Sequence, residues 1–313
     1  MKRLLISALG GSLFPYLHDK LKNDFDLYYL DNNVNIKKLY PDYNFFLAPA
    51  VQDSGYESFV KSIIKNCEIN FYIPLIDEEI ELALLKIESF NKTIIIAPNI
   101  EFVRLCLNKL KLMQFLEKNK ISIINSTSGK QFNNQIEFPI FVKPIKGRGS
   151  RGARSITSIE QLDAYYELEG YEPNDVLIQP LIKGTEYTVG VLTNNLNNII
   201  SISSKRIISK KGITQIAITE NKSHIDEVVF KVVKKMKPCG PINIQLMVDE
   251  FGEVKIFEIN PRFSTTSILE IEGGIDLISM FIEYYNKEYL EEPLRPLENI
   301  TIHRRWENVF YND

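Results

Sequence analysis

Three oxygen-bearing side chains late in the sequence have the spacing of a divalent-cation site. Glu258 and Asn260 lie two positions apart in an apolar, β-branched run, so on a strand both side chains point to the same face. Gln245 lies in the preceding apolar run, 242–248, and the polar, glycine-containing segment 249–253 separates the two runs. This pattern predicts a β-hairpin. A carboxylate beside amide oxygens suits Mg²⁺ when phosphate oxygens and water supply the remaining ligands.

The convergence of these oxygens depends on the turn. If residues 251 and 252 are the two central turn residues, antiparallel pairing places Gln245 directly opposite Glu258. A three-residue turn shifts the pairing by one residue and breaks the convergence. The proline after Asn260 favours extended backbone and ends the strand there, so Arg262 lies just beyond the metal-binding face.

A lysine and a glycine-rich loop form a second candidate set. Lys143 lies near the end of a predicted strand, 138–144, and the loop contains Gly147, Arg148, Gly149, Ser150, Arg151 and Gly152. The glycine spacing matches a dinucleotide-binding fingerprint, but the following residues, 153–156, are typical of a strand and not of a helix. A glycine loop between two strands can offer backbone N–H groups and arginine charge to a polyphosphate. A mobile surface hairpin is the alternative interpretation.

Strands and helices alternate over the first hundred residues. An apolar strand, 2–9, leads through a glycine turn, Gly10-Gly11-Ser12, into a helix and a second strand. The same order recurs with the predicted helix 56–66, strand 70–74, helix 77–88 and strand 93–97. We therefore predict a small doubly wound α/β domain over 1–98. The glycine turn lacks the third glycine of a nucleotide fingerprint, which favours a structural or substrate-site role.

Two basic segments in the rest of the chain are further candidates. The predicted helix 101–118 carries Lys109 and Lys111, which either form a solvated basic face or provide a phosphate contact. A predicted loop at 205–211 is equally basic. It is either solvated, or Lys205 or Arg206 reaches a phosphate or a substrate.

Composition excludes several classes of protein. The 313 residues are 44% hydrophobic and 25% charged, which fits about two globular domains. A net charge of −3 gives no reason to expect a nucleic-acid partner. Three widely spaced cysteines predict neither a disulfide framework nor a zinc site, and they fit a cytoplasmic location. The apolar start resembles a signal peptide, but its glycine pair argues against one, and no run is long enough to span a membrane.

The order of these features resembles the ATP-grasp superfamily, most closely its carbamoyl-phosphate-synthetase-like branch. The resemblance rests on the order of Lys143, the glycine loop, Gln179 to Leu181, Glu186, Gln245 and the series Glu258-x-Asn260-x-Arg262, and it covers nearly the whole chain. It implies a mixed α/β and α+β fold, in which a Rossmann-like pre-ATP-grasp domain, 1–98, precedes an ATP-grasp domain, 99–313. It also implies a mobile lid, about 130–181, that closes over ATP.

The same resemblance implies roles for individual residues. Lys109 and Lys143 contact the phosphates or the adenine N7, and the glycine loop closes over the phosphates. The backbone at 179–181 meets the adenine edge, and Glu186 binds the ribose hydroxyls. The implied nucleotide contacts are Lys109, Lys143, Gly147, Arg148, Gly149, Ser150, Gly152, Gln179, Pro180, Leu181 and Glu186. The implied ligands of Mg²⁺ or Mn²⁺ are Gln245, Glu258 and Asn260. The implied catalytic candidates are Arg262, Lys205 and Arg206.

The implied activity is an ATP-dependent ligase that activates a carboxylate as an acyl phosphate for attack by an amine or another nucleophile. The charge pattern supports this chemistry, because a triphosphate approached by a carboxylate needs cations that offset converging negative oxygens. Two alternatives are a phosphotransferase of the same fold and a non-catalytic ATP-binding sensor. The expected partners are a small carboxylate and a small nucleophile, without nucleic acid or membrane, and a homodimer is left open.

Overall fold

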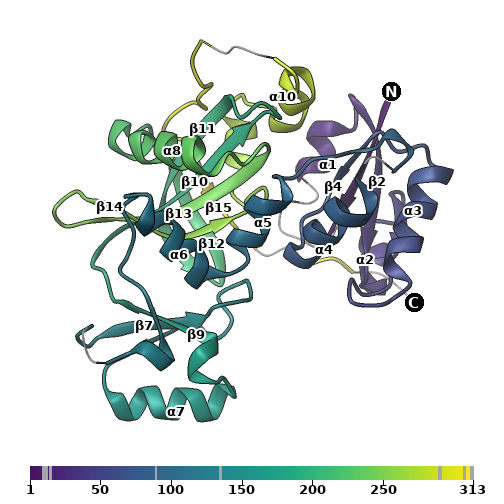
Figure 1. The fold of residues 1–313 in the computed structure, drawn as a ribbon. Helices are drawn as coiled ribbons and strands as arrows, with labels where there is room; N and C mark the ends of the chain where they lie inside the picture. The colour runs from purple at the N-terminus through teal and green to yellow at the C-terminus, as the bar shows by residue number, and fades with distance from the viewer. Residues whose placement is uncertain are drawn as a thin grey trace.

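The computed structural model describes residues 1–8, 13, 16–88, 90–133, 136–287, 291–305 and 308–310. Within these residues the strands form three sheets, here called A, B and C. Figure 1 shows sheet A in one lobe, sheet B in a central lobe, and sheet C with its helix in a smaller lobe that projects from the rest. The glycine turn Gly10-Gly11-Ser12 lies outside the described residues.

Sheet A is parallel and has the strand order β3-β2-β1-β4-β5. Its strands are β1 (Lys2–Ser7), β2 (Phe25–Asp31), β3 (Asn44–Leu47), β4 (Phe71–Ile73) and β5 (Ile94–Ile95). The helices of this lobe are α1 (Tyr16–Leu21), α2 (Val34–Leu39), α3 (Tyr56–Asn66) and α4 (Asp77–Leu82). The predicted helix 77–88 is α-helical only to Leu82 and continues as a π-helical turn, Ala83–Ile87. This strand order is that of a doubly wound sheet.

Sheet A is buried on both faces. Leu4 and Ile6 pack on one face in a cluster that includes residues of α1 and of α10 (Leu277–Tyr284), which comes from the C-terminal part of the chain. Leu5 packs on the other face with α3 and α4. Burial on both faces explains why β1 has a continuous apolar run and not an alternating one. The shared cluster joins this lobe to the central lobe.

Sheet B is antiparallel and has the order β14-β13-β10-β11-β12-β15. Its strands are β10 (Gly184–Thr193), β11 (Ile199–Lys211), β12 (Ile213–Thr219), β13 (Pro241–Asp249), β14 (Val254–Asn260) and β15 (Thr301–His303). The segment 205–211, predicted as a basic loop, is the second half of β11 and pairs with β12. This prediction was wrong because residues 205–211 carry no alternating apolar pattern, and it is pairing with β12 that makes them a strand.

One face of sheet B is covered by helices. These are α5 (Ile100–Cys106), α6 (Lys109–Lys118) and α8 (Ser223–Met236), whose apolar side chains pack against alternate residues of the strands. The predicted single helix 101–118 is broken in two because Asn108 caps α6, accepting a hydrogen bond from Lys111 N at 3.0 Å. The break places Lys109 at the first turn of α6, where its side chain is buried. A short helix, α9 (Ile268–Glu272), follows β14.

Sheet C has the order β6-β9-β7-β8. Its strands are β6 (Thr127–Ser128), β7 (Ile140–Pro144), β8 (Arg154–Ile156) and β9 (Val176–Pro180), and α7 (Ile159–Glu169) packs on it through Leu162 and Tyr165. Strands β7 and β8 are antiparallel and enclose the glycine loop. The prediction that this loop joins two strands is therefore confirmed.

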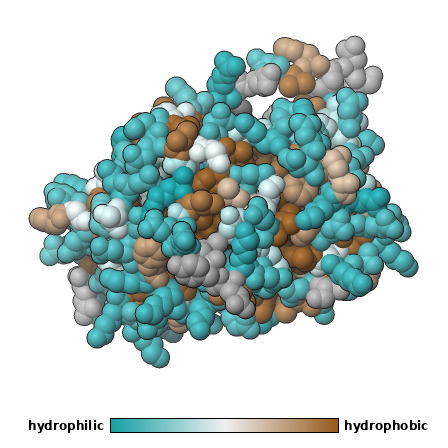
Figure 2. Space-filling view, turned by 90° about the horizontal axis from the view of Figure 1, so that it is seen from above, coloured by the Kyte–Doolittle hydropathy of each residue, from teal (hydrophilic) through white to brown (hydrophobic). Residues whose placement is uncertain are grey.

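The surface is dominated by polar groups on the face drawn in Figure 2, with apolar residues in separate patches. Scattered apolar residues are usual on a protein surface and do not by themselves mark an interface. Among the described residues, no helix is both long and apolar enough to cross a membrane.

Candidate functional site

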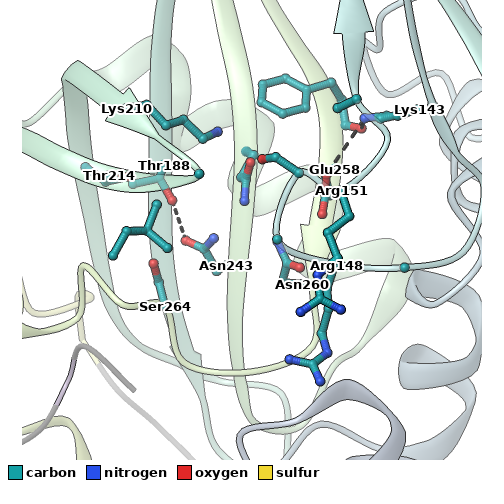
Figure 3. Close-up of a pocket in the computed structure, with 18 of the residues that line it drawn as sticks. Lys143, Arg148, Arg151, Thr188, Lys210, Thr214, Asn243, Glu258, Asn260 and Ser264 are labelled. Carbon is teal, nitrogen blue, oxygen red and sulfur yellow. Dashed lines mark hydrogen bonds and ion pairs between the residues drawn. The ribbon is translucent and has the colours of Figure 1, made fainter. Parts of the chain in front are cut away.

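A cavity at sheets B and C brings together most of the residues singled out in the sequence. Those that line it are Lys109, Lys143, Gly147, Arg148, Gly149, Ser150, Glu186, Gln245, Glu258, Asn260 and Arg262. They come from the start of α6, from the ends of strands β7 and β14 and the segment just after β14, from the first half of β10, from the middle of β13, and from the glycine loop, 145–153. Figure 3 shows Lys143 and Glu258 pointing toward each other across this space. Side chains more than a hundred positions apart in sequence thus share one site.

The turn of the β13–β14 hairpin differs from the prediction. Gly252 N donates to Asp249 O and Asp249 N donates to Glu253 O, both at 3.0 Å. These bonds enclose a three-residue loop, with Gly252 at φ +82°. Glycine at this position is typical of three-residue hairpin loops. By itself, this loop would turn Gln245 away from Glu258.

A β-bulge restores the pairing. The register shifts between Gln245 and Leu246, so Gln245 pairs with Glu258 while Phe257 has no partner on β13. The shift also appears in the core, where Ile256 and Ile259 both pack on the covered face although an odd number of positions separates them. The predicted opposition of Gln245 and Glu258 is therefore confirmed, but through a longer turn and a bulge.

The bulged residue holds the lysine of β7. Lys143 Nζ donates to Phe257 O at 2.9 Å, lies 3.8 Å from Glu258 Oε2 and lies 5.1 Å from the centroid of the Phe257 ring. Burial lowers the pKa of Lys143 to about 8, although the Glu258 carboxylate opposes the shift. The ammonium is thus positioned between the two sheets, beside the carboxylate expected to bind a metal ion.

Two further lysines at the cavity have partners. Lys109 Nζ donates to Gly147 O at 2.6 Å, which joins the start of α6 to the glycine loop. Lys210 Nζ donates to Glu186 Oε1 at 2.6 Å. Of the two candidates on the basic helix, Lys109 lines this cavity, whereas Lys111 lines a neighbouring cleft. Lys210, which belongs to the predicted basic loop 205–211, is a cavity residue.

The glycine loop depends on its glycines for conformation. Gly147 and Gly149 have φ of +120° and +70°, and an added Cβ would meet no heavy atom within 4 Å at either position. The requirement is therefore for backbone freedom and not for space. Gly152, at φ +68°, does not line the cavity, and a Cβ there would lie within 3.0 Å of Tyr171 and Pro144. Its role is to let the loop pack against its own lobe.

Sequence reasoning missed Asn243 and Thr188. Both are more than nine-tenths buried and line the cavity, and Thr188 Oγ1 donates to Asn243 Oδ1 at 2.6 Å (Figure 3). Asn243 pairs with Asn260 across the hairpin. A usable signal was present, because Asn243 lies two positions before Gln245 and strand alternation places both on one face.

The oxygen donors on this face fit a hard divalent cation. Glu258 supplies a carboxylate, and Gln245 and Asn260 supply amide oxygens from the same wall of the cavity. No group of three or more His, Cys, Asp or Glu side chains that could hold a metal ion occurs among the described residues. A single carboxylate with amides suits Mg²⁺ or Mn²⁺ that shares its coordination with phosphate oxygens.

Arg262 is fixed from another lobe. Its Nε donates to Asp77 Oδ1 of α4 at 2.7 Å, and its Nη1 donates to Phe263 O at 3.3 Å. The Arg262 and Asp77 side chains are 20% and 12% exposed. Arg262 therefore lines the cavity while its Nε is held by α4 of the sheet A lobe.

The catalytic candidates Lys205 and Arg206 do not line the cavity. Lys205 is on the cavity side of sheet B, opposite Thr188, but it is fully buried in an ion pair with Glu270 Oε1 at 2.6 Å. Arg206 points to the other face, where its Nε donates to Glu220 Oε1 at 2.6 Å. Neighbouring side chains on a strand face opposite sides. The two therefore cannot both reach the site, and the structure places neither there.

The predicted adenine-binding segment, Gln179, Pro180 and Leu181, also lies outside the lining residues. Leu181 N donates to Pro139 O at 3.2 Å, and Gln179 Nε2 donates to Ser126 Oγ at 2.7 Å. Phe141, which pairs with Gln179 from β7, lines the cavity instead. A contact between residues 179–181 and adenine stays a prediction.

Comparison with known families matches residues 106–266 to the ATP-grasp domain. The matched segment spans the glycine loop and the β13–β14 hairpin, and it contains the cavity-lining residues from Lys109 to Arg262.

Two relatives illustrate the similarity in sequence. D-alanine–D-alanine ligase of Bacillus velezensis is 25% identical over 215 residues, which cover 62% of this chain and 60% of the ligase. A carbamoyl-phosphate synthase of Methanobrevibacter smithii is 22% identical over 316 residues, which cover 89% of this chain and 83% of that protein. The match thus spans about three fifths of the length of the first relative.

Solved structures share the fold over most of the chain. The biotin carboxylase domain of a Hydrogenobacter thermophilus 2-oxoglutarate carboxylase, solved with MgADP and bicarbonate, has a TM-score of 0.76 at 16% identity and covers 93% of this chain and 71% of its own. An L-amino acid ligase of Bacillus licheniformis has a TM-score of 0.70 at 16% identity, covering 95% and 75%. At these identities the likeness shows the fold.

Proposed function

This chain belongs to the ATP-grasp family, and from that premise we propose that it is an ATP-dependent ligase that activates a carboxylate as an acyl phosphate. One observation carries the proposal. Lys143 from sheet C and Glu258 from sheet B approach to 3.8 Å, with Arg262 lining the same cavity. A reaction between two anions requires positive charge at the reacting atoms. This cavity provides it through two cationic side chains and a carboxylate proposed to bind a metal ion.

The nucleotide is proposed to lie between the two sheets. Lys109 and Lys143 would contact its phosphates, and the exposed N–H groups of the loop 147–150 would close over them. Glu186 would accept hydrogen bonds from the ribose hydroxyls, with Lys210 holding the carboxylate in place at 2.6 Å. Each proposed contact is made by a cavity-lining residue.

Glu258, Asn260 and Gln245 would hold Mg²⁺ or Mn²⁺. When bound, the ion offsets charge on the phosphate oxygens and orients them. The protein side chains contribute the rigid part of this site, because Glu258 and Gln245 are paired residues of one hairpin.

In the proposed first step, an oxygen of the substrate carboxylate attacks the γ-phosphorus. The bond from that phosphorus to the bridging oxygen breaks, and ADP leaves. Lys143 and Arg262 stabilise the negative charge that builds on the transferring group, so no side-chain nucleophile is required.

In the second step, an amine or another nucleophile attacks the acyl carbon. The bond between this carbon and the phosphate oxygen breaks, the nucleophile loses a proton, and phosphate leaves with one oxygen from the original carboxylate. The substrates are small molecules. The names of two relatives, a D-alanine–D-alanine ligase and an L-amino acid ligase, make amino acids the first compounds to test. A homodimer stays a prediction.

Hydroxylamine trapping tests this activity. The protein, ATP and Mg²⁺ are incubated with a panel of D- and L-amino acids and other carboxylates, and hydroxamate and ADP are measured. We expect one class of acid to give both products in equal amounts, and Glu258→Ala to give neither. ADP without hydroxamate, together with a stable phosphorylated product, would identify a phosphotransferase. No ADP with any compound would count against catalysis and favour an ATP-binding sensor.

A further inference from the structure

The orientation of Arg262 is set by one residue from a distant part of the chain. Asp77, 185 positions earlier, accepts the Nε hydrogen bond at 2.7 Å. The neighbouring Nη1 donates to Phe263 O, whereas Nη2 has no hydrogen-bond partner among the described residues. Arginine presents its donors in a rigid planar fork, so fixing Nε fixes the direction of the outer edge. The unpartnered Nη2 is thus directed by Asp77.

Asp77 is itself firmly held. It lies in the first turn of α4, and Glu79, two positions later, is fully buried. The Glu79 carboxylate accepts hydrogen bonds from Ser7 Oγ at 2.5 Å and from the hydroxyls of Tyr56 and Tyr72. These donors come from the end of β1, from α3 and from β4, so the first turn of α4 is attached to three elements of the sheet A lobe.

The segment between β4 and α4 is attached at the same point. Leu75 N donates to Ser7 Oγ at 2.8 Å, and Ser7 donates in turn to Glu79. Burial raises the pKa of Glu79, and its three hydroxyl donors act in the opposite direction. A buried carboxyl group with this many partners is costly to disturb, because each lost partner leaves a buried polar atom unsatisfied.

A second ion pair on α4 provides an internal control. Glu81 Oε1 accepts a hydrogen bond from Arg104 Nε at 2.7 Å, the same length as the Asp77–Arg262 bond. The Glu81 and Arg104 side chains are 35% and 56% exposed, and Arg104 does not line the cavity of sheets B and C. Exposed pairs of this kind contribute little free energy. The two pairs share a helix and a bond length, and Asp77, Glu81 and Arg104 line the same neighbouring cleft. The pairs differ in burial, and of the two arginines only Arg262 lines the cavity of sheets B and C.

We infer that Asp77 is a positioning residue for catalysis: it orients Arg262 from the sheet A lobe, so that this lobe completes the active site. The inference rests on the proposed function, because it assigns Arg262 to the transferring phosphoryl group or the substrate carboxylate. In this inference Asp77 acts through the guanidinium and not on a reactant. The network around Glu79 is the anchor that keeps α4 in place.

A double-mutant cycle tests this role. Asp77→Asn, Arg262→Met and the double variant are assayed for kcat and KM by hydroxamate formation, with the acid that serves the wild type best. Asp77→Asn is expected to lower kcat about 10- to 100-fold and to change the KM for ATP less than about threefold. In the Arg262→Met background, Asp77→Asn is expected to change kcat by less than about twofold, because its only target is gone.

Glu81→Gln is the matched control and is expected to keep kcat within about twofold of the wild type. Asp77→Glu, which keeps the charge but displaces the guanidinium, is expected to fall between the wild type and Asp77→Asn, and it remains informative if Asp77→Asn folds poorly. The inference would be overturned, with the proposed function left standing, by an unchanged kcat in both Asp77 variants. It would also be overturned if Asp77→Asn lowered kcat as much in the Arg262→Met background as in the wild type. Absence of hydroxamate from the wild type would overturn the proposed function as well.

Discussion

The two walls of the cavity are built in opposite ways. The β13–β14 wall belongs to a sheet whose other face is buried under helices, and it presents side chains: Glu258, Asn260 and Gln245. The facing wall is the glycine loop, 145–153, which is mostly exposed and contains residues with positive φ. The first wall fixes the positions of oxygen atoms, and the second offers backbone N–H groups in a conformation that side chains disfavour.

This difference suggests a division of labour. The β13–β14 wall suits the proposed metal binding and phosphoryl transfer, which need fixed distances, because packing and strand pairing hold each side chain in place. The glycine loop suits the proposed closure over a nucleotide, because few contacts must be broken for it to move. Lys143 connects the two walls, because it lies in β7 just before the loop and donates a hydrogen bond to the carbonyl of Phe257 in the hairpin.

Substitution on the rigid wall should have the largest effect. Glu258→Gln removes the only carboxylate among the proposed metal ligands, so we expect the rate of ADP formation to fall by about three orders of magnitude. Glu253→Gln, in the exposed turn of the same hairpin, is the control, and we expect its rate to stay near that of the wild type. Steady-state ADP release at several Mg²⁺ concentrations measures both. Equal losses in the two variants would contradict a special role for Glu258.

Lys143, which lies between the two walls, should make the affinity for a nucleotide depend on pH. Burial lowers the pKa of Lys143 to about 8, so the free protein loses this positive charge as the pH rises through that value. Phosphate binds the charged form, and the dissociation constant for ADP should therefore rise by up to about tenfold between pH 7 and pH 9. Calorimetric titration at constant ionic strength measures it. Lys143→Met should bind more weakly and show no such slope; a slope that survives this substitution would assign it to another group.

Substitution on the loop should have a moderate effect. Gly149→Ala puts a side chain at φ +70°, which costs roughly 1–2 kcal/mol in the observed conformation. Only part of this cost should fall on nucleotide binding, so we expect the KM for ATP to rise about three- to tenfold. Gly170→Ala is a close control, because Gly170 has φ +69° and open space around it but lies at the end of α7, away from the cavity. A rise in the KM for ATP in both variants would show that the effect comes from lost stability.

The smallest effect is expected where the loop meets α4. Arg148 Nε lies 3.5 Å from Glu78 Oε2, with 41% and 49% of the two side chains exposed. A pair this exposed contributes little, so Glu78→Gln should change the KM for ATP by less than about twofold. The neighbouring Asp77, buried against Arg262, is expected to behave very differently. A large effect of Glu78→Gln on steady-state kinetics would mean that the loop is more tightly held than its exposure indicates.

The sequence was most informative where local rules decide the structure. Strand alternation correctly placed Glu258 and Asn260 on one face, and apolar runs between polar turns located four of the five strands of sheet A; the edge strand β3 was missed. The opposition of Gln245 and Glu258 was predicted for an incomplete reason. The three-residue turn shifts the register by one residue, and the bulge at Phe257 shifts it back. Both changes left a local signal, because Gly252 suits a three-residue turn and the apolar residues Ile256 and Ile259 break strict alternation.

Tertiary contacts explain the remaining differences. The partner of Arg262 is Asp77, and no local pattern connects two residues in different lobes. Lys205 was a reasonable candidate by charge and lies on the cavity side of its sheet, but an ion pair with Glu270 from α9 buries it. The break between α5 and α6 was locally visible in Asn108, a good capping residue, although helical periodicity continues across it. Charge and spacing identify candidates, and packing decides which of them reach the cavity.

Oxygen transfer from the carboxylate is the most direct test of the proposed reaction. The acid that gives the strongest hydroxamate signal is labelled with ¹⁸O in its carboxyl group and incubated with ATP, Mg²⁺, the protein and an amine. The released phosphate is then analysed by mass spectrometry. An acyl phosphate pathway predicts one ¹⁸O atom in each phosphate formed. Release of phosphate without label, at the same rate as product, would contradict it.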